Sequence, residues 1–189
     1  MQVKVNQKNL GAALNIVSKA VNNNNTLPIL NNLLLVAKDQ TLTLSATNLE
    51  IAIVEPIQAE IIQEGSITVP AKLLQSYVSL LKNEDLSLTL NDNKLLSIES
   101  SKSSTTINTI EALDYPNIPK IESDISLSLQ AAELLKALNY TSFACSINTT
   151  QPVLAGVFLE ISKENLTFAA TDSYRLSEYK IPQAIAVEE

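Results

Sequence analysis

The spacing of apolar residues predicts two amphipathic helices within the first 82 residues. One face of the first helix carries Leu10, Leu14, Val17 and Val21, and its other face carries Lys8, Gly11, Ala12, Asn15 and Lys19. One face of the second helix carries Leu74, Val78 and Leu81, and its other face carries Lys72, Gln75, Ser76, Ser79 and Lys82. The asparagines at positions 22–25 predict the end of the first helix, because Asn favours caps and turns.

β-Strands are predicted where apolar and polar residues alternate, or where Ser, Thr and Ile cluster. These segments are 33–37, 40–46, 86–90, 94–99 and 103–110. Asn91-Asp92-Asn93 is a turn signal between two of the segments, and it predicts a β-hairpin there.

The sequence aligns with itself, without a gap, when it is shifted by 124 residues. The matched pairs include Leu10 with Leu134, Leu14 with Leu138, Pro28 with Pro152, and Ala46-Thr47 with Ala170-Thr171. Such agreement over about fifty positions indicates a duplicated domain. The second copy starts near residue 125, so we expect this chain to end within its second domain.

A weaker repeat lies inside the first copy, at a shift of 64 residues. It pairs Val5 with Val69, Lys8 with Lys72, Leu10 with Leu74, and Leu14 with Val78. The repeat implies a unit of one strand, one helix and several strands, used twice in each domain. We therefore expect an α+β fold in which the helices lie on one side and antiparallel sheets on the other.

Composition excludes several classes of function. The chain has no His and a single Cys, Cys145, which excludes a Ser–His or Cys–His nucleophile pair, a His-ligated metal site and an internal disulfide. No apolar run approaches the roughly 18–20 residues that cross a bilayer, and the N-terminus lacks a signal-peptide pattern. We expect a cytoplasmic protein without a metal, a cofactor or a membrane partner.

The net charge of −7 argues against a protein that grips nucleic acid over its whole surface, but the charge is unevenly distributed. Positions 1–38 and 65–83 hold lysines and no acidic residue, whereas 39–64 and 84–124 are rich in acids. Each acid-free segment contains one predicted helix. Two interpretations fit the polar face of each helix: it is covered by water alone, or it makes weak, sequence-independent contacts with phosphates. Neither helix carries an Arg, which argues against base reading.

Several separated motifs resemble the bacterial DNA polymerase III beta subunit, the DNA sliding clamp. Residues 27–34 (LPILNNLL) are similar to the helix-to-strand junction of that family, and residues 115–119 (YPNIP) resemble the linker that closes its first domain. Pro152-Val153-Leu154 and residues 170–176 (ATDSYRL) resemble its second domain.

The resemblance implies the DNA-clamp fold, with helices lining a ring and sheets outside. Residues 1–120 would form a complete first domain, and residues 121–189 the N-terminal half of the second. The third domain of the family would be absent.

The resemblance also implies a non-catalytic function. Clamps of this family are head-to-tail homodimers that encircle duplex DNA without sequence specificity. They tether the replicative polymerase, the clamp loader and other proteins that carry clamp-binding motifs. The implied DNA-facing residues are Lys8, Lys19, Asn24, Lys72, Lys82, Lys136, Asn139 and Asn148. The acid-rich remainder would repel phosphates everywhere except inside the ring.

A second implied site is the cleft that receives short peptides from these partners. Its residues here are Leu154, Thr171, Ser173, Tyr174, Arg175 and Leu176. The apolar members would accept hydrophobic side chains, and Arg175 would bind carbonyl or carboxylate groups of an extended segment. The sequence has Gln151, Ser173 and Tyr174 where Arg, Gly and His are frequent in the family, which leaves the preferred motif open.

Two other classes of function are compatible with parts of the pattern. One is a β-rich peptide-binding module that does not act on DNA; retention on circular but not linear DNA would separate a clamp from it. The other is a carboxylate-dependent hydrolase, although no motif marks an acid/base pair. Substitution of Asp172 would test for hydrolysis.

Overall fold

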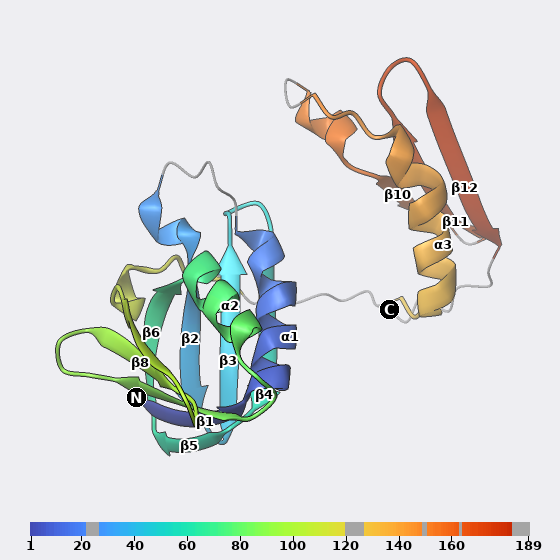
Figure 1. The fold of residues 1–189 in the computed structure, drawn as a ribbon. Helices are drawn as coiled ribbons and strands as arrows, with labels where there is room; N and C mark the ends of the chain where they lie inside the picture. Colours follow the sequence, from blue (N-terminus) through green and yellow to red (C-terminus); the bar gives the residue numbers. More distant parts are fainter. Residues whose placement is uncertain (22–26, 120–126, 149–150, 163, 183–189) are drawn as a thin grey trace. The chain divides into compact units, whose positions relative to one another are not determined.

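The computed structural model describes residues 1–21, 27–119, 127–148, 151–162 and 164–182. The chain divides into two compact units, which we call unit 1 (Met1–Pro119) and unit 2 (Lys120–Glu189). Figure 1 shows that each unit combines helices with antiparallel strands. Among the described residues, no helix has the length and apolar character needed to cross a bilayer.

Unit 1 is built from strands, two α-helices and short 3-10 turns. Its strands are β1 (Gln2–Asn6), β2 (Asn32–Lys38), β3 (Thr41–Thr47), β4 (Ala52–Gln58), β5 (Glu60–Gln63), β6 (Gly65–Pro70), β7 (Asp85–Leu90), β8 (Leu95–Glu99) and β9 (Ser104–Asn108). Its helices are α1 (Gln7–Val17) and α2 (Ala71–Leu80), with 3-10 turns η1 (Ser18–Ala20), η2 (Pro28–Asn31) and η3 (Ala112–Asp114).

The strands of unit 1 form two antiparallel sheets, in the orders β5-β1-β7-β8-β9 and β4-β3-β2-β6. The first strand of each repeat joins the sheet of the other repeat, because β1 pairs with β7 and β6 pairs with β2. This exchange connects the two repeats through backbone hydrogen bonds. The predicted repeat of strand, helix and strands is confirmed, with Val5 of β1 and Val69 of β6 both buried.

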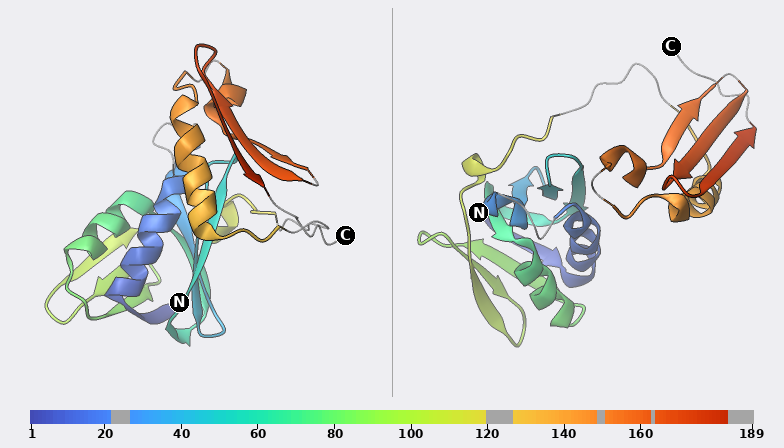
Figure 2. Two further views of the ribbon diagram at one scale, coloured as in Figure 1. Left: turned by 90° about the vertical axis from the view of Figure 1, so that its right-hand side faces the viewer. Right: turned by 90° about the horizontal axis from the view of Figure 1, so that it is seen from above.

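The two helices of unit 1 lie side by side over the sheets (Figures 1 and 2). Their predicted apolar faces enter one core cluster, in which Leu10, Leu14, Leu74 and Val78 are fully buried. Burial of such side chains stabilises the fold by about 1.5–3 kcal/mol each.

Part of the face that we expected to be open instead forms the contact between the helices. A Cβ atom on Gly11 would lie 3.9 Å from Cγ1 of Val78. The side chain of Gln7 donates a hydrogen bond to the carbonyl of Val78 at 2.8 Å, and that of Gln75 donates to Oδ1 of Asn15 at 2.8 Å. These contacts fix the spacing of α1 and α2.

The first helix is shorter than its apolar pattern predicts. α1 ends at Val17, the next residues tighten into η1, and Val21 has an extended backbone (φ −89°, ψ 115°). Val21 nevertheless packs half-buried against the core. The pattern therefore predicted its burial but not its backbone conformation. Likewise α2 ends at Leu80, and Leu81 is an extended cap.

Tyr115, in the segment after η3, closes the end of unit 1. It is buried, and its hydroxyl accepts a hydrogen bond from the amide of Thr47 at 3.1 Å. The same hydroxyl donates to the carbonyl of Asn32 at 3.4 Å. Burial raises the pKa of Tyr115 above its ordinary value. The side chain thus joins the end of β3 to the start of β2.

Unit 2 repeats the first half of this arrangement. Its elements are α3 (Ala131–Thr141), η4 (Ser142–Ala144), η5 (Pro152–Ala155), β10 (Phe158–Ile161), β11 (Asn165–Thr171) and β12 (Leu176–Pro182). The sheet order is β10-β11-β12, and α3 packs on β11 and β12. The core is small, and Leu138 is 37% exposed, although its repeat equivalent Leu14 is fully buried in unit 1.

Candidate functional site

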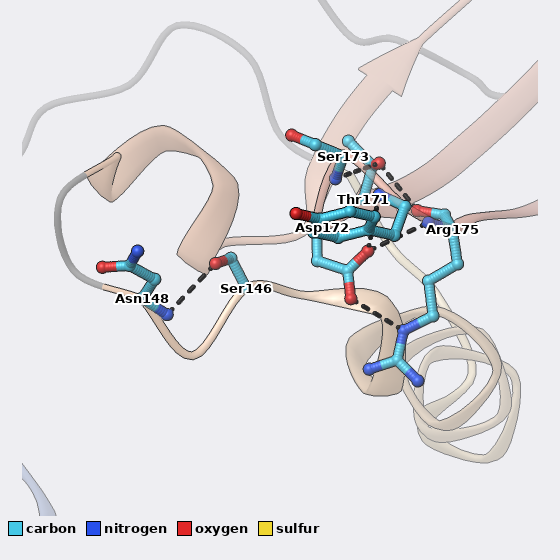
Figure 3. A network of polar contacts seen from close by, with 7 residues as sticks. Ser146, Asn148, Thr171, Asp172, Ser173 and Arg175 are labelled. Carbon is cyan, nitrogen blue, oxygen red and sulfur yellow. Dashed lines mark hydrogen bonds and ion pairs between the residues drawn. The ribbon is translucent and has the colours of Figure 1, made fainter.

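Most of the residues expected in the peptide cleft meet in a tight turn between β11 and β12 (Figure 3). The hydroxyl of Thr171 donates to the carbonyl of Arg175 at 2.7 Å and accepts from the amide of Ser173 at 3.1 Å. Oδ1 of Asp172 accepts from the amides of Tyr174 at 3.1 Å and Arg175 at 2.9 Å. These bonds hold Ser173 at a φ of 75°, in the left-handed region that residues with side chains rarely occupy.

The side chain of Arg175 is held on two sides. Its Nε lies 3.0 Å from Oδ2 of Asp172, and its Cζ lies 5.7 Å from the ring centroid of Phe143 in η4. Hydrogen bonds from the amides of Arg175 and Tyr174, together with the nearby guanidinium, hold the pKa of Asp172 below its ordinary value. The carboxylate therefore stays ionised at neutral pH and keeps its contact with Arg175.

The apolar residues beside the turn are open to solvent. Tyr174 is 98% exposed and Leu176, at the start of β12, is 72% exposed. Leu154 is half-buried in η5, and its carbonyl accepts a hydrogen bond from the amide of Ser146 at 2.8 Å. The described part of the structure shows no hydrogen bond between Leu154 and the turn.

The same turn occurs in unit 1, 124 positions earlier in the sequence. There the hydroxyl of Thr47 donates to the carbonyl of Ile51 at 2.9 Å, and Leu49 has a φ of 75°. Oδ1 of Asn48 accepts from the amides of Glu50 at 3.0 Å and Ile51 at 2.8 Å. Asn therefore supports this backbone as Asp does, and unit 1 has Ile51 in the position of the arginine.

The lysines expected to face DNA in unit 1 are all exposed at or beside the two helices. Lys8 and Lys72 lie in the first turns of α1 and α2, Lys19 lies in η1, and Lys82 follows α2. In the described part of the chain, none of these ammonium groups makes an ion pair. Their charges are therefore available to a phosphate ligand.

In unit 2 the expected DNA-facing residues have more varied surroundings. Lys136 and Asn139 are exposed on α3, and Nζ of Lys136 lies 5.9 and 5.8 Å from the ring centroids of Tyr140 and Tyr179. Asn148 is exposed, and its amide donates to the hydroxyl of Ser146 at 3.1 Å. Asn24 lies outside the described residues.

Comparison with known proteins gives the family. Residues 1–119 match the family model of the DNA polymerase III beta subunit, N-terminal domain, and residues 128–189 match that of its central domain. The chain belongs to the DNA polymerase III beta subunit family. The beta sliding clamp of Synechococcus elongatus is 37% identical over 191 residues, which cover 98% of this chain and 50% of that protein. The chain spans about half the length of the curated relatives it matches.

Solved structures of this family share the fold. Caulobacter crescentus pol III beta has a TM-score of 0.89 at 31% identity, over 96% of this chain and 51% of that one. A DnaN sliding clamp from Pseudomonas aeruginosa bound to griselimycin has a TM-score of 0.90 at 28% identity, over 100% of this chain and 52% of that one. The predicted DNA-clamp fold is confirmed by these likenesses.

Two residues at or beside the turn were not among the expected cleft residues. Asp172 lies within the family motif, but its contact with both the turn amides and Arg175 depends on the folded geometry. Phe143 corresponds to Lys19 under the 124-residue shift, so the repeat itself gave no sign of an aromatic group there. Phe143 is 57% exposed, and its ring lies next to the guanidinium.

Proposed function

We propose that this chain is part of a beta sliding clamp, a non-catalytic processivity factor that encircles duplex DNA and tethers the replicative polymerase. The observation that carries the proposal is the pair of helices α1 and α2, whose exposed lysines make no ion pair with any described residue, in a member of the beta subunit family. The chain is otherwise acidic, with a net charge of −7. This distribution favours DNA on the helical side of unit 1 and opposes it elsewhere.

The contact with DNA is electrostatic and independent of sequence. Lysines that meet phosphates release counterions, and each contact lowers the slope of log K against log salt by about 0.9. A few such contacts give weak binding that permits sliding, while encirclement supplies retention. Asn24, Asn139 and Asn148 join the lysines as residues proposed to approach the backbone of DNA.

We infer that a second unit of strand, helix and strands completes unit 2. Leu138 of α3 is partly exposed, whereas Leu14 of α1 is fully buried in a core that includes Leu74 and Val78 of α2. A helix equivalent to α2 would cover α3 in the same way. Under this proposal residues 1–120 are the first clamp domain, residues 121–189 are half of the second, and the ring is a homodimer of the longer protein.

The turn between β11 and β12 is proposed as one wall of the partner-peptide cleft. Exposed Tyr174 and Leu176 offer apolar surface, and Arg175 offers hydrogen-bond donors. The partners are the polymerase catalytic subunit, the clamp loader and other proteins with clamp-binding motifs. Because a related clamp was solved bound to griselimycin, we propose griselimycin as a ligand of this protein and as a probe of the cleft.

Retention on DNA tests the clamp function. Loaded protein is expected to remain on nicked circular DNA and to leave when the DNA is linearised. Lys19→Glu with Lys82→Glu should reduce the magnitude of the salt slope by about 1.8 for each copy of the chain, because two phosphate contacts are removed. The control is Lys38→Glu with Lys94→Glu, which makes the same charge change at the end of β2 and in the turn between β7 and β8. Equal slopes in both double variants would exclude the proposed lining, and equal retention on linear DNA would favour a peptide-binding module that does not act on DNA.

Griselimycin binding tests the cleft separately. Arg175→Ala should weaken binding while leaving retention on circular DNA unchanged. Ile51→Ala, at the equivalent position of the turn in unit 1, is the matched control and should leave both unchanged. Loss of both activities in the Arg175 variant would indicate misfolding rather than loss of a contact.

A further inference from the structure

Asp172 has two separate tasks in the turn. Its Oδ1 accepts hydrogen bonds from two backbone amides, which shapes the turn, and its Oδ2 contacts Nε of Arg175 at 3.0 Å. The first task needs only a side-chain oxygen acceptor. The second needs a second acceptor oxygen with negative charge, which only a carboxylate provides.

Unit 1 shows that the two tasks can be separated. Asn48 makes the same pair of amide contacts through Oδ1, and Leu49 has the same φ of 75° as Ser173. With Ile51 in place of the arginine, Asn is sufficient there. The carboxylate at position 172 is therefore not required by the turn, and its second oxygen serves the guanidinium.

The contact restricts how Arg175 can meet a ligand. The ion pair uses Nε, and the ring of Phe143 lies beside Cζ at 5.7 Å. The two terminal nitrogens of the guanidinium make no marked contact with the residues drawn in Figure 3. A long side chain that would otherwise sample many rotamers is thus held before any ligand arrives.

Resting on the peptide cleft proposed above, we propose that Asp172 is a positioning residue. It holds the Arg175 guanidinium beside Phe143 and directs its terminal N–H groups to an uncharged carbonyl oxygen of a bound peptide. An exposed Arg alone would favour a carboxylate. Because the Asp172 carboxylate already contacts the guanidinium, a carboxylate on the ligand would be repelled by this nearby like charge. The net charge of −7 adds to that repulsion. A main-chain or amide carbonyl is not repelled.

The test compares Asp172→Asn with the unchanged intact protein, using fluorescent hexapeptides that carry two leucines and one variable position. The two peptides of each pair differ only at that position, which is Gln in one and Glu in the other. The pairs are chosen from peptides that displace griselimycin from the unchanged protein. The unchanged protein should bind the Gln peptide more tightly than the Glu peptide. In Asp172→Asn the Gln peptide should bind about 2- to 12-fold more weakly, the effect of ordering one long side chain on binding.

The same substitution should change the preference as well as the affinity. The ratio of Glu-peptide to Gln-peptide affinity should rise roughly 1.5- to 5-fold in Asp172→Asn, because the freed guanidinium pairs with the ligand carboxylate. This gain should disappear in high salt. A purely structural role of Asp172 would weaken both peptides equally and leave the ratio constant. In the NMR spectrum of Asp172→Asn, the amide resonances of Tyr174 and Arg175 should keep the chemical shifts expected of an intact turn, which shows that the substitution has not unfolded it.

Each outcome has a distinct meaning. An unchanged ratio with weaker binding of both peptides, or unchanged binding of both, overturns the positioning role but leaves the cleft in place if Arg175→Ala still weakens griselimycin. If neither griselimycin nor any peptide binds the unchanged protein, the cleft itself is withdrawn, and the role of Asp172 with it. Phe143→Leu, which keeps an apolar side chain, should also weaken the Gln peptide and leave the ratio unchanged.

Discussion

Tyr115→Phe tests whether a single hydroxyl holds the end of unit 1 together. The substitution keeps the ring in its buried position but removes the group that accepts from the amide of Thr47 and donates to the carbonyl of Asn32. Thr47 and Asn32 are themselves buried, so water cannot readily replace the lost partner. A buried amide left without a hydrogen bond costs about 1–3 kcal/mol, and we expect unit 1 to lose that amount of stability.

Two measurements follow this loss. Urea unfolding monitored by circular dichroism should show a lower midpoint with an unchanged slope, and the melting temperature should fall by about 2–8 °C for each kcal/mol. Hydrogen exchange at the Thr47 amide should accelerate more than exchange at amides of α1. If the midpoint stays within error and Thr47 exchanges as before, the hydroxyl contacts are not a source of stability and the reasoning is wrong.

The effect of Tyr115 also has a predicted pH dependence. Burial raises the pKa of Tyr115 above its ordinary value of 10.0, so the unfolded chain loses the phenolic proton first as pH rises. The stabilisation is therefore complete below about pH 10 and is lost as the pH rises through the folded-state pKa. The Phe variant has no such proton. The difference in stability between the two proteins should narrow above pH 10 and stay constant between pH 6 and 9.

Three further outcomes can be checked on the same chain. Gly11→Ala should stabilise unit 1 by about 0.5–1 kcal/mol in urea unfolding, because a Cβ there meets Val78 at an ordinary 3.9 Å and Ala is the better helix former; destabilisation would mean that the helices cannot accept the methyl group. Leu14→Ala should lower the free energy of unfolding by about 2–5 kcal/mol, and Leu138→Ala at the repeat-equivalent position should lower it clearly less, because Leu138 is partly exposed. Equal losses of stability would refute the inference that the core of unit 2 is incomplete. Amide hydrogen bonds lower the pKa of Asp172, so the NMR shifts of the Tyr174 and Arg175 amides should stay constant near neutral pH and change only as the pH falls through that lowered value, whereas Asp172→Asn should show no such transition.

Hydrophobic periodicity predicted those elements whose burial is one-sided. Leu10, Leu14, Leu74 and Val78 repeat at helical spacing because α1 and α2 each bury one face. The same signal misplaced the end of α1, because Val21 is half-buried from an extended backbone.

β4 was not predicted as a separate strand. Pro56 lies within it, and a proline there is compatible with the edge position that β4 holds in its sheet.

The site was predictable only as far as its residues lie together in the sequence. Thr171, Ser173 and Arg175 belong to one short motif, and the structure joins them in one turn. Phe143 lies about thirty positions earlier, and nothing in its local pattern distinguishes it from an ordinary exposed aromatic residue. Its place beside Arg175 follows from how η4 lies against the sheet of unit 2, which is a tertiary property.

The duplication explains how one backbone serves two purposes. The turns at 47–51 and 171–175 share the same hydrogen bonds and the same left-handed residue, so the scaffold was in place in both copies. What differs is the side-chain set. Unit 1 has Ile51 where unit 2 has Arg175, and it has Lys19, proposed to meet phosphates, where unit 2 has Phe143. A turn that depends only on Thr and on Asn or Asp leaves its other positions free to diverge. The proposed recognition of a peptide carbonyl rests on the arginine, the second carboxylate oxygen and the aromatic ring, and of the two turns only the one in unit 2 combines these three groups.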